Sequence, residues 1–349
     1  EAHLHPQLQM KLLKFIRDTY SETNFATFQT ILTTHSPNLA SKAPLESMIL
    51  VSNGAAFPLT KSETLLDPED YVFLEKFLDV TKSNLFFAKS VLIVEGDGEN
   101  ILLPTISNIL GRPLEDYGVS VVNVGSTAYT RYAKIFLRRA ALNSDTSKLP
   151  IRVACLRDID LWPESADKDV NDEVGFKTLK TGNKHYWLPR TGPDGTVFGT
   201  AVADKKKSLQ SFEIQHEGGK LILDDLQNTQ VFVSDEWTFE YCLIRSGLAE
   251  DIYDLVKGED DSAFAGLPTD PELRAIKIYG LIESSSLKTD VAYRLSQKLI
   301  EDYSDADGKD RLLDKIPAYI KAAIAYVTEP FSTPPTVAAT AIEAATGGE

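Results

Sequence analysis

Three short apolar runs, separated by segments of helical periodicity, constrain the fold more than any other feature of the sequence. They occupy residues 90–94, 119–124 and 151–156 (SVLIV, VSVVNV and IRVACL). Each run is predominantly apolar and lacks regular alternation with polar residues, which is typical of strands covered by helices on both faces. Helices are expected between the runs, at 99–110 and 127–142. The pattern predicts an α/β fold built on a parallel sheet.

Acidic residues collect where these predicted strands end. Glu95 directly follows the first run, and Gly96 allows a sharp turn into a helix whose first turn contains Glu99. Asp158 and Asp160 follow the third run, and two residues that are two positions apart in extended chain point to the same side. Because parallel strands end at one edge of a sheet, we expect these carboxylates to share one small volume.

Carboxylates that lie so close together repel one another and raise one another's pKa. A divalent cation between them removes the repulsion, and oxygen ligands without His or Cys favour Mg²⁺ or Mn²⁺ over Zn²⁺. Any one of these acids could instead cap a helix or end a strand in solvent. The combination of all four predicts a metal site.

These residues resemble a known family. The stretch from about residue 88 to residue 302 resembles the Toprim fold of topoisomerases, bacterial primases and OLD (overcoming lysogenization defect) nucleases. The Toprim signature is a Glu after the first strand and a DxD after the third, which Glu95, Asp158 and Asp160 match. The additional Glu99 and the motifs EWTFEYCL and LKTDVAYRLSQKL resemble the OLD nucleases in particular.

The resemblance implies two further site residues. Glu240 falls on another metal ligand of the family, and Lys288 falls on its cationic catalytic residue. Their local settings leave alternatives open, because an acid in the first turn of a helix is favoured by the helix dipole and a lysine can simply be exposed. However, Lys288 begins an amphipathic helix, where a cation is unfavourable, and such a departure from local preference hints at function. Ser126 could contact a metal or phosphate, although an N-cap role is favoured.

Together these residues indicate a two-metal endonuclease. The implied ligands of two Mg²⁺ or Mn²⁺ ions are Glu95, Glu99, Asp158, Asp160 and Glu240. The implied catalytic residues are Lys288, Glu95 and Asp158. The expected substrate is DNA, and the family resemblance suggests phage defence. The alternatives are a metal-bound nucleic-acid-binding or regulatory module, or an enzyme of the topoisomerase or primase type.

The first ninety residues resemble the end of an ABC-type ATPase domain of the SMC, RecF and OLD lineage. The resemblance is carried by EAHLHPQLQ at 1–9 and ILTTHSPNL at 31–39, where His35 falls on the switch residue that senses the γ-phosphate. No GxxxxGK[ST] motif is present, so ATP is expected to bind in the intact protein and ATPase activity is not expected from this fragment alone. The resemblance also implies a homodimer or higher oligomer formed through the ATPase domain.

Local patterns divide the chain into three parts. Residues 1–87 are assigned to the ATPase fragment, with a helix at 5–22, a buried strand that runs into a polar turn over 25–37, and a hairpin at 48–60 that turns at Asn53-Gly54. Residues 88–302 are assigned to the Toprim domain, with an insertion at about 161–220. Residues 303–349 are expected to form a helix at 313–327 and a flexible tail.

Charge and hydropathy limit the partners. A net charge of −15 repels nucleic acid, although bound metal ions would offset it locally, and basic clusters lie at 138–139 and 205–207. No apolar stretch approaches the roughly 20 residues of a membrane span, so we expect a cytoplasmic protein without membrane contact. Cys155 and Cys242 lack the spacing of a metal or redox motif and are expected to be core thiols.

Overall fold

The fold is taken from a computed structural model of the chain. The structure describes residues 5–22, 30–125, 128–142, 147–163, 166, 190–191, 195, 197–198, 200–216, 219–224, 227–258, 261–285 and 287–329. Ser126 and most of the predicted insertion and tail lie outside the described residues.

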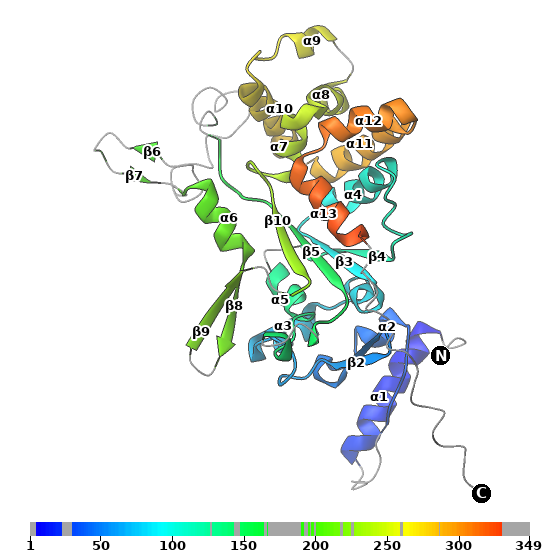
Figure 1. Cartoon of the computed structure of the whole chain (residues 1–349). Helices are drawn as coiled ribbons and strands as arrows, with labels where there is room; N and C mark the ends of the chain where they lie inside the picture. Colours follow the sequence, from blue (N-terminus) through cyan, green and yellow to red (C-terminus); the bar gives the residue numbers. More distant parts are fainter. Residues whose placement is uncertain are drawn as a thin grey trace, which may run out of the picture.

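A four-stranded parallel sheet forms the centre of the molecule (Figure 1). Its strands are β3 (Ser90–Val94), β4 (Val119–Asn123), β5 (Arg152–Arg157) and β10 (Thr229–Val233), in the spatial order β10-β5-β3-β4. The strands β3 and β5 are neighbours, and Ile93 pairs with Cys155 in their register. All strands therefore end at one edge, and the predicted α/β fold with a parallel sheet is confirmed.

Helices cover both faces of this sheet, as strands without polar alternation require. Leu92 and Val94 of β3 belong to one hydrophobic core, and Val91 and Ile93 belong to the other. The first core contains α4 (Asp97–Ile109), α11 (Lys288–Tyr303) and α13 (Ala318–Thr328), and the second contains α3 (Pro68–Phe77) and α5 (Tyr129–Lys134). Helix α13 packs on β5, β10 and β3, so the segment after residue 303 shares the core of the sheet.

The N-terminal region is only partly as expected. Helix α1 (Pro6–Glu22) and the antiparallel hairpin of β1 (Ile49–Ser52) and β2 (Ala55–Pro58) are confirmed. The turn residues Asn53 and Gly54 both have positive φ, at 51° and 75°, as a tight two-residue hairpin turn requires. The buried strand predicted at 25–37 is wrong where it is described, because residues 30–36 form no strand and the side chain of Ile31 is 80% exposed.

Two predicted helices are shorter than expected. The helix predicted at 127–142 ends at Lys134, because the chain beyond it pairs with an earlier segment instead of continuing the helix. Thr64 forms an antiparallel bridge with Arg138, and the N–H of Leu65 donates to the carbonyl of Leu137 at 3.0 Å. The helix predicted at 313–327 is divided into α12 (Ala306–Lys315) and α13, because Pro317 cannot continue the first of them.

The remaining elements lie in the insertion and in the helical part that follows β10. The described parts of the insertion are β6 (Arg190–Thr191), β7 (Val197–Phe198), α6 (Val202–Gln210), β8 (Ser211–His216) and β9 (Gly219–Asp224). The helical part contains α7 (Phe239–Leu243), the π-helix η8 (Ile244–Leu248), α8 (Ala249–Lys257), α9 (Asp261–Ala265) and α10 (Pro271–Ser285). The segment before the sheet also includes α2 (Pro37–Ala40), η1 (Leu45–Ser47) and η2 (Lys82–Phe87), and η3 (Ala140–Leu142) precedes β5.

Both cysteines are buried and free, as expected of core thiols. Within the described ranges, no helix combines the length and the apolar character that crossing a bilayer requires.

Candidate metal centre at the carboxyl edge of the sheet

Glu95 and Asp158 lie next to each other at the ends of the neighbouring strands β3 and β5. The backbone N–H of Asp158 donates to Oε2 of Glu95 at 3.4 Å, and both residues are partly buried. Residues that are far apart in the sequence thus meet at the carboxyl edge, where open parallel sheets bind their ligands. The catalytic and ligand roles of Glu95 and Asp158 stay predictions.

Two glycines make room for further carboxylates at this edge. A Cβ added to Gly96 would lie 3.0 Å from Oε2 of Glu99, and one added to Gly98 would lie 3.4 Å from Oε1 of Glu240. Glu99 is in the first turn of α4 and is 6% exposed. The close approach to the Gly96 and Gly98 backbone explains how the first turn of α4 accommodates both acids.

Glu240 reaches the site from the first turn of α7. The turn begins at Thr238, whose side chain caps the helix by accepting a hydrogen bond from the N–H of Tyr241 at 3.3 Å. An acid in this position is favoured by the helix dipole, as the sequence suggested. Its proximity to Gly98 nevertheless places its carboxylate beside the N-terminus of α4.

The buried acids influence one another's ionisation. Burial and, to a smaller extent, the charge of Glu240 together raise the pKa of Glu99 to about 7. The pKa of Asp158 is raised well above its ordinary value by burial and by the charges of Glu99, Glu240 and Asp160. Lys288 acts in the opposite direction on both residues. Glu99 and Asp158 therefore share one electrostatic environment in which ionisation of both is disfavoured.

Lys288 is the cation of this group. Its Nζ lies 3.0 Å from Oε2 of Glu283 and 3.9 Å from Oε2 of Glu240, and it donates to Oη of Tyr279 at 3.3 Å. Burial by itself lowers the pKa of Lys288, but Glu240, Tyr279 and Glu283 raise it overall. The lysine is thus charged next to the carboxylates, although the N-terminus of α11 disfavours it.

Asp160 departs from the extended geometry that the sequence suggested. Strand β5 ends at Arg157, and Asp160 adopts a left-handed backbone conformation with φ of 56°, while its N–H donates to the carbonyl of Trp237 at 2.9 Å. The premise that Asp158 and Asp160 point to one side of an extended chain is therefore wrong. Burial raises the pKa of Asp160, while the charges of Arg157, Lys205 and Lys288 lower it, so its carboxylate still belongs to the same environment.

The carboxylate oxygens gathered here are suitable ligands for a hard divalent cation. Buried carboxylates with raised pKa values, such as Glu99 and Asp158, are ionised more readily when a cation lies between them. In the described part of the chain, however, no three His, Cys, Asp or Glu side chains already form a complete set of ligands. In addition, Glu95 is engaged in an ion pair with Arg157, a residue that the sequence motifs did not single out. Only its position directly before the DxD could have drawn attention to it.

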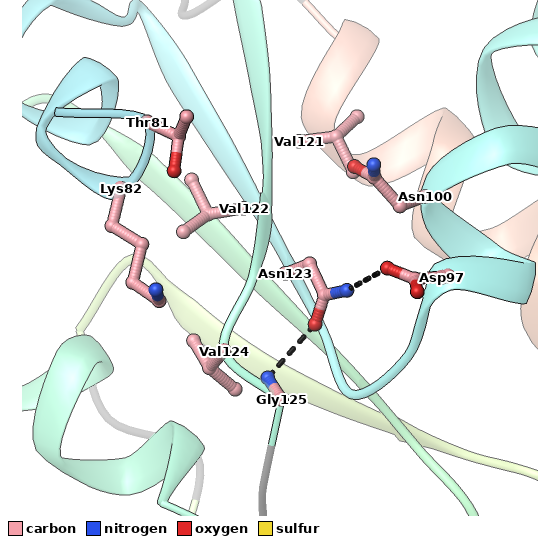
Figure 2. A pocket seen from close by; sticks show the side chains of 9 residues that line it. All are labelled: Thr81, Lys82, Asp97, Asn100, Val121, Val122, Asn123, Val124 and Gly125. Carbon is pink, nitrogen blue, oxygen red and sulfur yellow. Dashed lines mark hydrogen bonds between the residues drawn. The ribbon is translucent and has the colours of Figure 1, made fainter. Parts of the chain in front are cut away.

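A cavity of about 390 Å³ lies beside this edge, at the end of β4 (Figure 2). Asn123 donates to Oδ1 of Asp97 at 2.7 Å and accepts from the N–H of Gly125 at 2.8 Å, and Figure 2 shows Asp97 turned toward Asn123. The lining consists of Thr81, Lys82, Asp97, Asn100, Val121, Val122, Asn123, Val124 and Gly125. Asp97 thus faces this cavity, and the buried carboxylates do not line it.

The predicted nucleotide residue His35 lies outside regular structure, just before α2. Its side chain is exposed, and its ring centroid is 6.3 Å from that of Phe87. The role of His35 as a γ-phosphate sensor stays a prediction.

Comparison with known proteins identifies two regions of the chain. Residues 86–160 match the family model described as "Overcoming lysogenization defect protein-like, TOPRIM domain", and residues 1–41 match the model described as "AAA domain, putative AbiEii toxin, Type IV TA system". No curated protein matches the chain.

Two solved structures are similar to the chain over most of their length. The C-terminal region of the Xanthomonas campestris pv. campestris OLD protein is 21% identical, with coverage of 70% of this chain and 94% of that chain and a TM-score of 0.38. The C-terminal region of the Burkholderia pseudomallei OLD protein is 22% identical, with coverage of 69% and 97% and a TM-score of 0.39.

Proposed function

We propose that this chain, whose residues 86–160 match the OLD-like TOPRIM model, is an OLD-family DNA endonuclease that depends on Mg²⁺ or Mn²⁺. The observation that carries the proposal is the meeting of Glu95 and Asp158 at the ends of two neighbouring strands, with Glu99 and Glu240 beside them. Acids gathered at this edge suit a reaction in which divalent cations bind phosphate oxygens.

Each side chain has a defined task in this proposal. Two ions would be held by Glu95, Glu99, Asp158, Asp160 and Glu240. Glu95 would bind an ion while it also pairs with Arg157. When bound, the ions activate a water molecule and stabilise the negative charge of the leaving oxygen. Lys288 would turn from Glu283 toward the scissile phosphate and neutralise the charge that develops there.

Basic residues of α6 support a polyanionic substrate. This helix carries Lys205, Lys206 and Lys207, one of the basic clusters of an otherwise acidic chain. Nζ of Lys206 lies 2.6 Å from Oδ1 of Asp235, which follows β10. Burial raises the pKa of Asp160, and the charge of Lys205 offsets part of that rise. The lysines thus lie next to the carboxyl edge, where they would attract the phosphates of DNA.

The intact protein would couple this activity to ATP. The match of residues 1–41 to an AAA domain model supports that coupling, and His35 is the residue of this segment that we assign to nucleotide sensing. Oligomerisation through the ATPase domain belongs to the same proposal.

Cleavage of supercoiled plasmid DNA tests the proposal. We expect the wild-type chain with Mn²⁺ to produce nicked and then linear plasmid, and Asp158→Ala to abolish both products without unfolding the protein. Asp310→Ala is the matched control, because Asp310 is an exposed acid on α12. If wild-type protein with Mn²⁺ or Mg²⁺ leaves the plasmid supercoiled, the endonuclease proposal fails and a regulatory or binding module is favoured.

A further inference from the structure

Arg157 is a buried cation directly beneath the candidate metal centre. It is the last residue of β5 and is only 4% exposed. Its guanidinium forms an ion pair with Glu95 and lies over the ring of Tyr129, 4.4 Å from the centroid. Among the described residues, its Nε has no hydrogen-bond acceptor, and its Nη1 is the atom that faces Glu95. Burying a charge with so few hydrogen bonds is costly, which suggests that Arg157 serves the site as well as the fold.

The Glu95 carboxylate is held from two sides. One oxygen, Oε1, faces the guanidinium of Arg157, and the other, Oε2, accepts the N–H of Asp158. The two contacts fix the rotation of the carboxylate, so that Oε2 is turned toward Asp158. Without Arg157, repulsion from the neighbouring acids would favour rotation of Glu95 outward, into water.

Tyr129 keeps Arg157 in place. The ring of Tyr129 is 5% exposed, and its hydroxyl donates to the carbonyl of Leu209 in α6. A planar guanidinium can lie on an aromatic face and still present its edge to a carboxylate, which an ammonium group cannot do in the same way. The insertion helix, Tyr129, Arg157 and Glu95 thus form a continuous chain of contacts.

We propose that Arg157 is a positioning residue, which orients Glu95 so that its Oε2 is available to a divalent cation shared with Asp158. The inference rests on the proposed metal-dependent function and adds to it a residue that does not itself touch the cation. Hydrogen-bonding partners of metal ligands have this effect in other sites, where their loss weakens metal binding by about 10- to 100-fold.

Arg152 provides a matched control on the same strand. It begins β5, its Nη1 lies 2.9 Å from Oε2 of Glu329, and its guanidinium is 5.4 Å from the ring centroid of Tyr326. Arg152 therefore makes the same kinds of contact as Arg157, but at the amino edge of the sheet.

The test compares Arg157→Met, Arg157→Lys and Arg152→Met in the full chain. Mn²⁺ affinity is measured by electron paramagnetic resonance of the free ion, and plasmid nicking is measured across Mn²⁺ concentrations. We expect Arg157→Met to weaken Mn²⁺ binding about 10- to 100-fold, with nicking restored at saturating Mn²⁺. Arg157→Lys should weaken Mn²⁺ binding about threefold or more, and the Mn²⁺ affinity of Arg152→Met should stay within about twofold of wild type.

The outcomes separate this inference from the proposed function. A folded Arg157→Met protein that binds Mn²⁺ as tightly as wild type, or more tightly, overturns the positioning role while the metal site stands. A nicking rate that stays low at saturating Mn²⁺ also overturns it, because the loss of activity would then reflect a general structural defect and not weaker metal binding. Wild-type protein that binds no more Mn²⁺ than Asp158→Ala overturns both proposals. If Arg157→Met does not fold, Arg157→Lys decides, and wild-type affinity in that variant contradicts the inference.

Discussion

The N–H of Asp158 and Oε2 of Glu95 are 3.4 Å apart, and this contact joins the ends of two parallel strands that are separated by more than fifty residues of sequence. Glu99 and Glu240 extend the group from the first turns of α4 and α7. The consequences for stability, catalysis and DNA binding can be tested separately.

Glu99 should make the metal-free protein less stable as the pH rises. Its pKa is about 7 in the folded chain and 4.5 in the reference state, so the folded form holds a proton more tightly. The stability that this proton provides is present below pH 4.5 and is lost as the pH rises to about 7. Glu99 should therefore lower the free energy of unfolding, measured with urea in EDTA, by on the order of 2 to 3 kcal/mol between pH 4.5 and 7. Glu99→Gln should remove this part of the pH dependence.

Glu301→Gln is the control for that measurement, since Glu301 is exposed on α11. Equal pH dependence of the free energy of unfolding in wild type and Glu99→Gln would show that Glu99 is not protonated in the folded chain near neutral pH.

Lys288→Met should reduce the rate of cleavage and leave the protein folded. Removing a single group that stabilises charge in a transition state typically lowers kcat by about 10²- to 10³-fold. Mn²⁺ affinity should not fall, because the variant loses a cation that lies 3.9 Å from Glu240. Single-turnover nicking at saturating Mn²⁺ measures the effect, and Lys76→Met on α3 is the exposed control. A cleavage rate within twofold of wild type would remove Lys288 from the mechanism.

Replacing both Lys205 and Lys207 with Ala should weaken DNA binding and lower its salt dependence. Each lost phosphate contact reduces the slope of log K against log salt by about 0.9 on duplex DNA. Fluorescence anisotropy in EDTA measures binding without cleavage. The pair Lys11→Ala and Lys14→Ala on α1 removes the same charge elsewhere. Equal slopes for the two double variants would mean that α6 does not contact the substrate.

The sequence predicted the sheet and the meeting of its acids because both depend on regular geometry. Apolar strands with helices between them impose parallel pairing, and parallel pairing places Glu95 and Asp158 at one edge. Glu240 comes from a helix beyond the insertion, and the family resemblance was the main indication that it belongs to the same site as Glu99.

The features that the sequence did not predict depend on long-range contacts. Arg157 directly follows the apolar run at 151–156, and nothing in the run indicates that its guanidinium pairs with Glu95. The helix after Tyr129 is interrupted by the pairing of Thr64 with Arg138, and helical periodicity alone does not reveal such a contact. Asp160 does not adopt the extended conformation that the sequence pattern suggested, because its N–H donates to the carbonyl of Trp237, which lies in a later segment.

The central claim is that acids from β3, β5, α4 and α7 bind cations together at the carboxyl edge. Crystals soaked in Mn²⁺ and measured at the manganese absorption edge test it most directly. The account predicts anomalous peaks within bonding distance of carboxylate oxygens of Glu95, Glu99, Asp158 or Glu240. Absence of any peak at these carboxylates, at an Mn²⁺ concentration that supports plasmid cleavage, would contradict it.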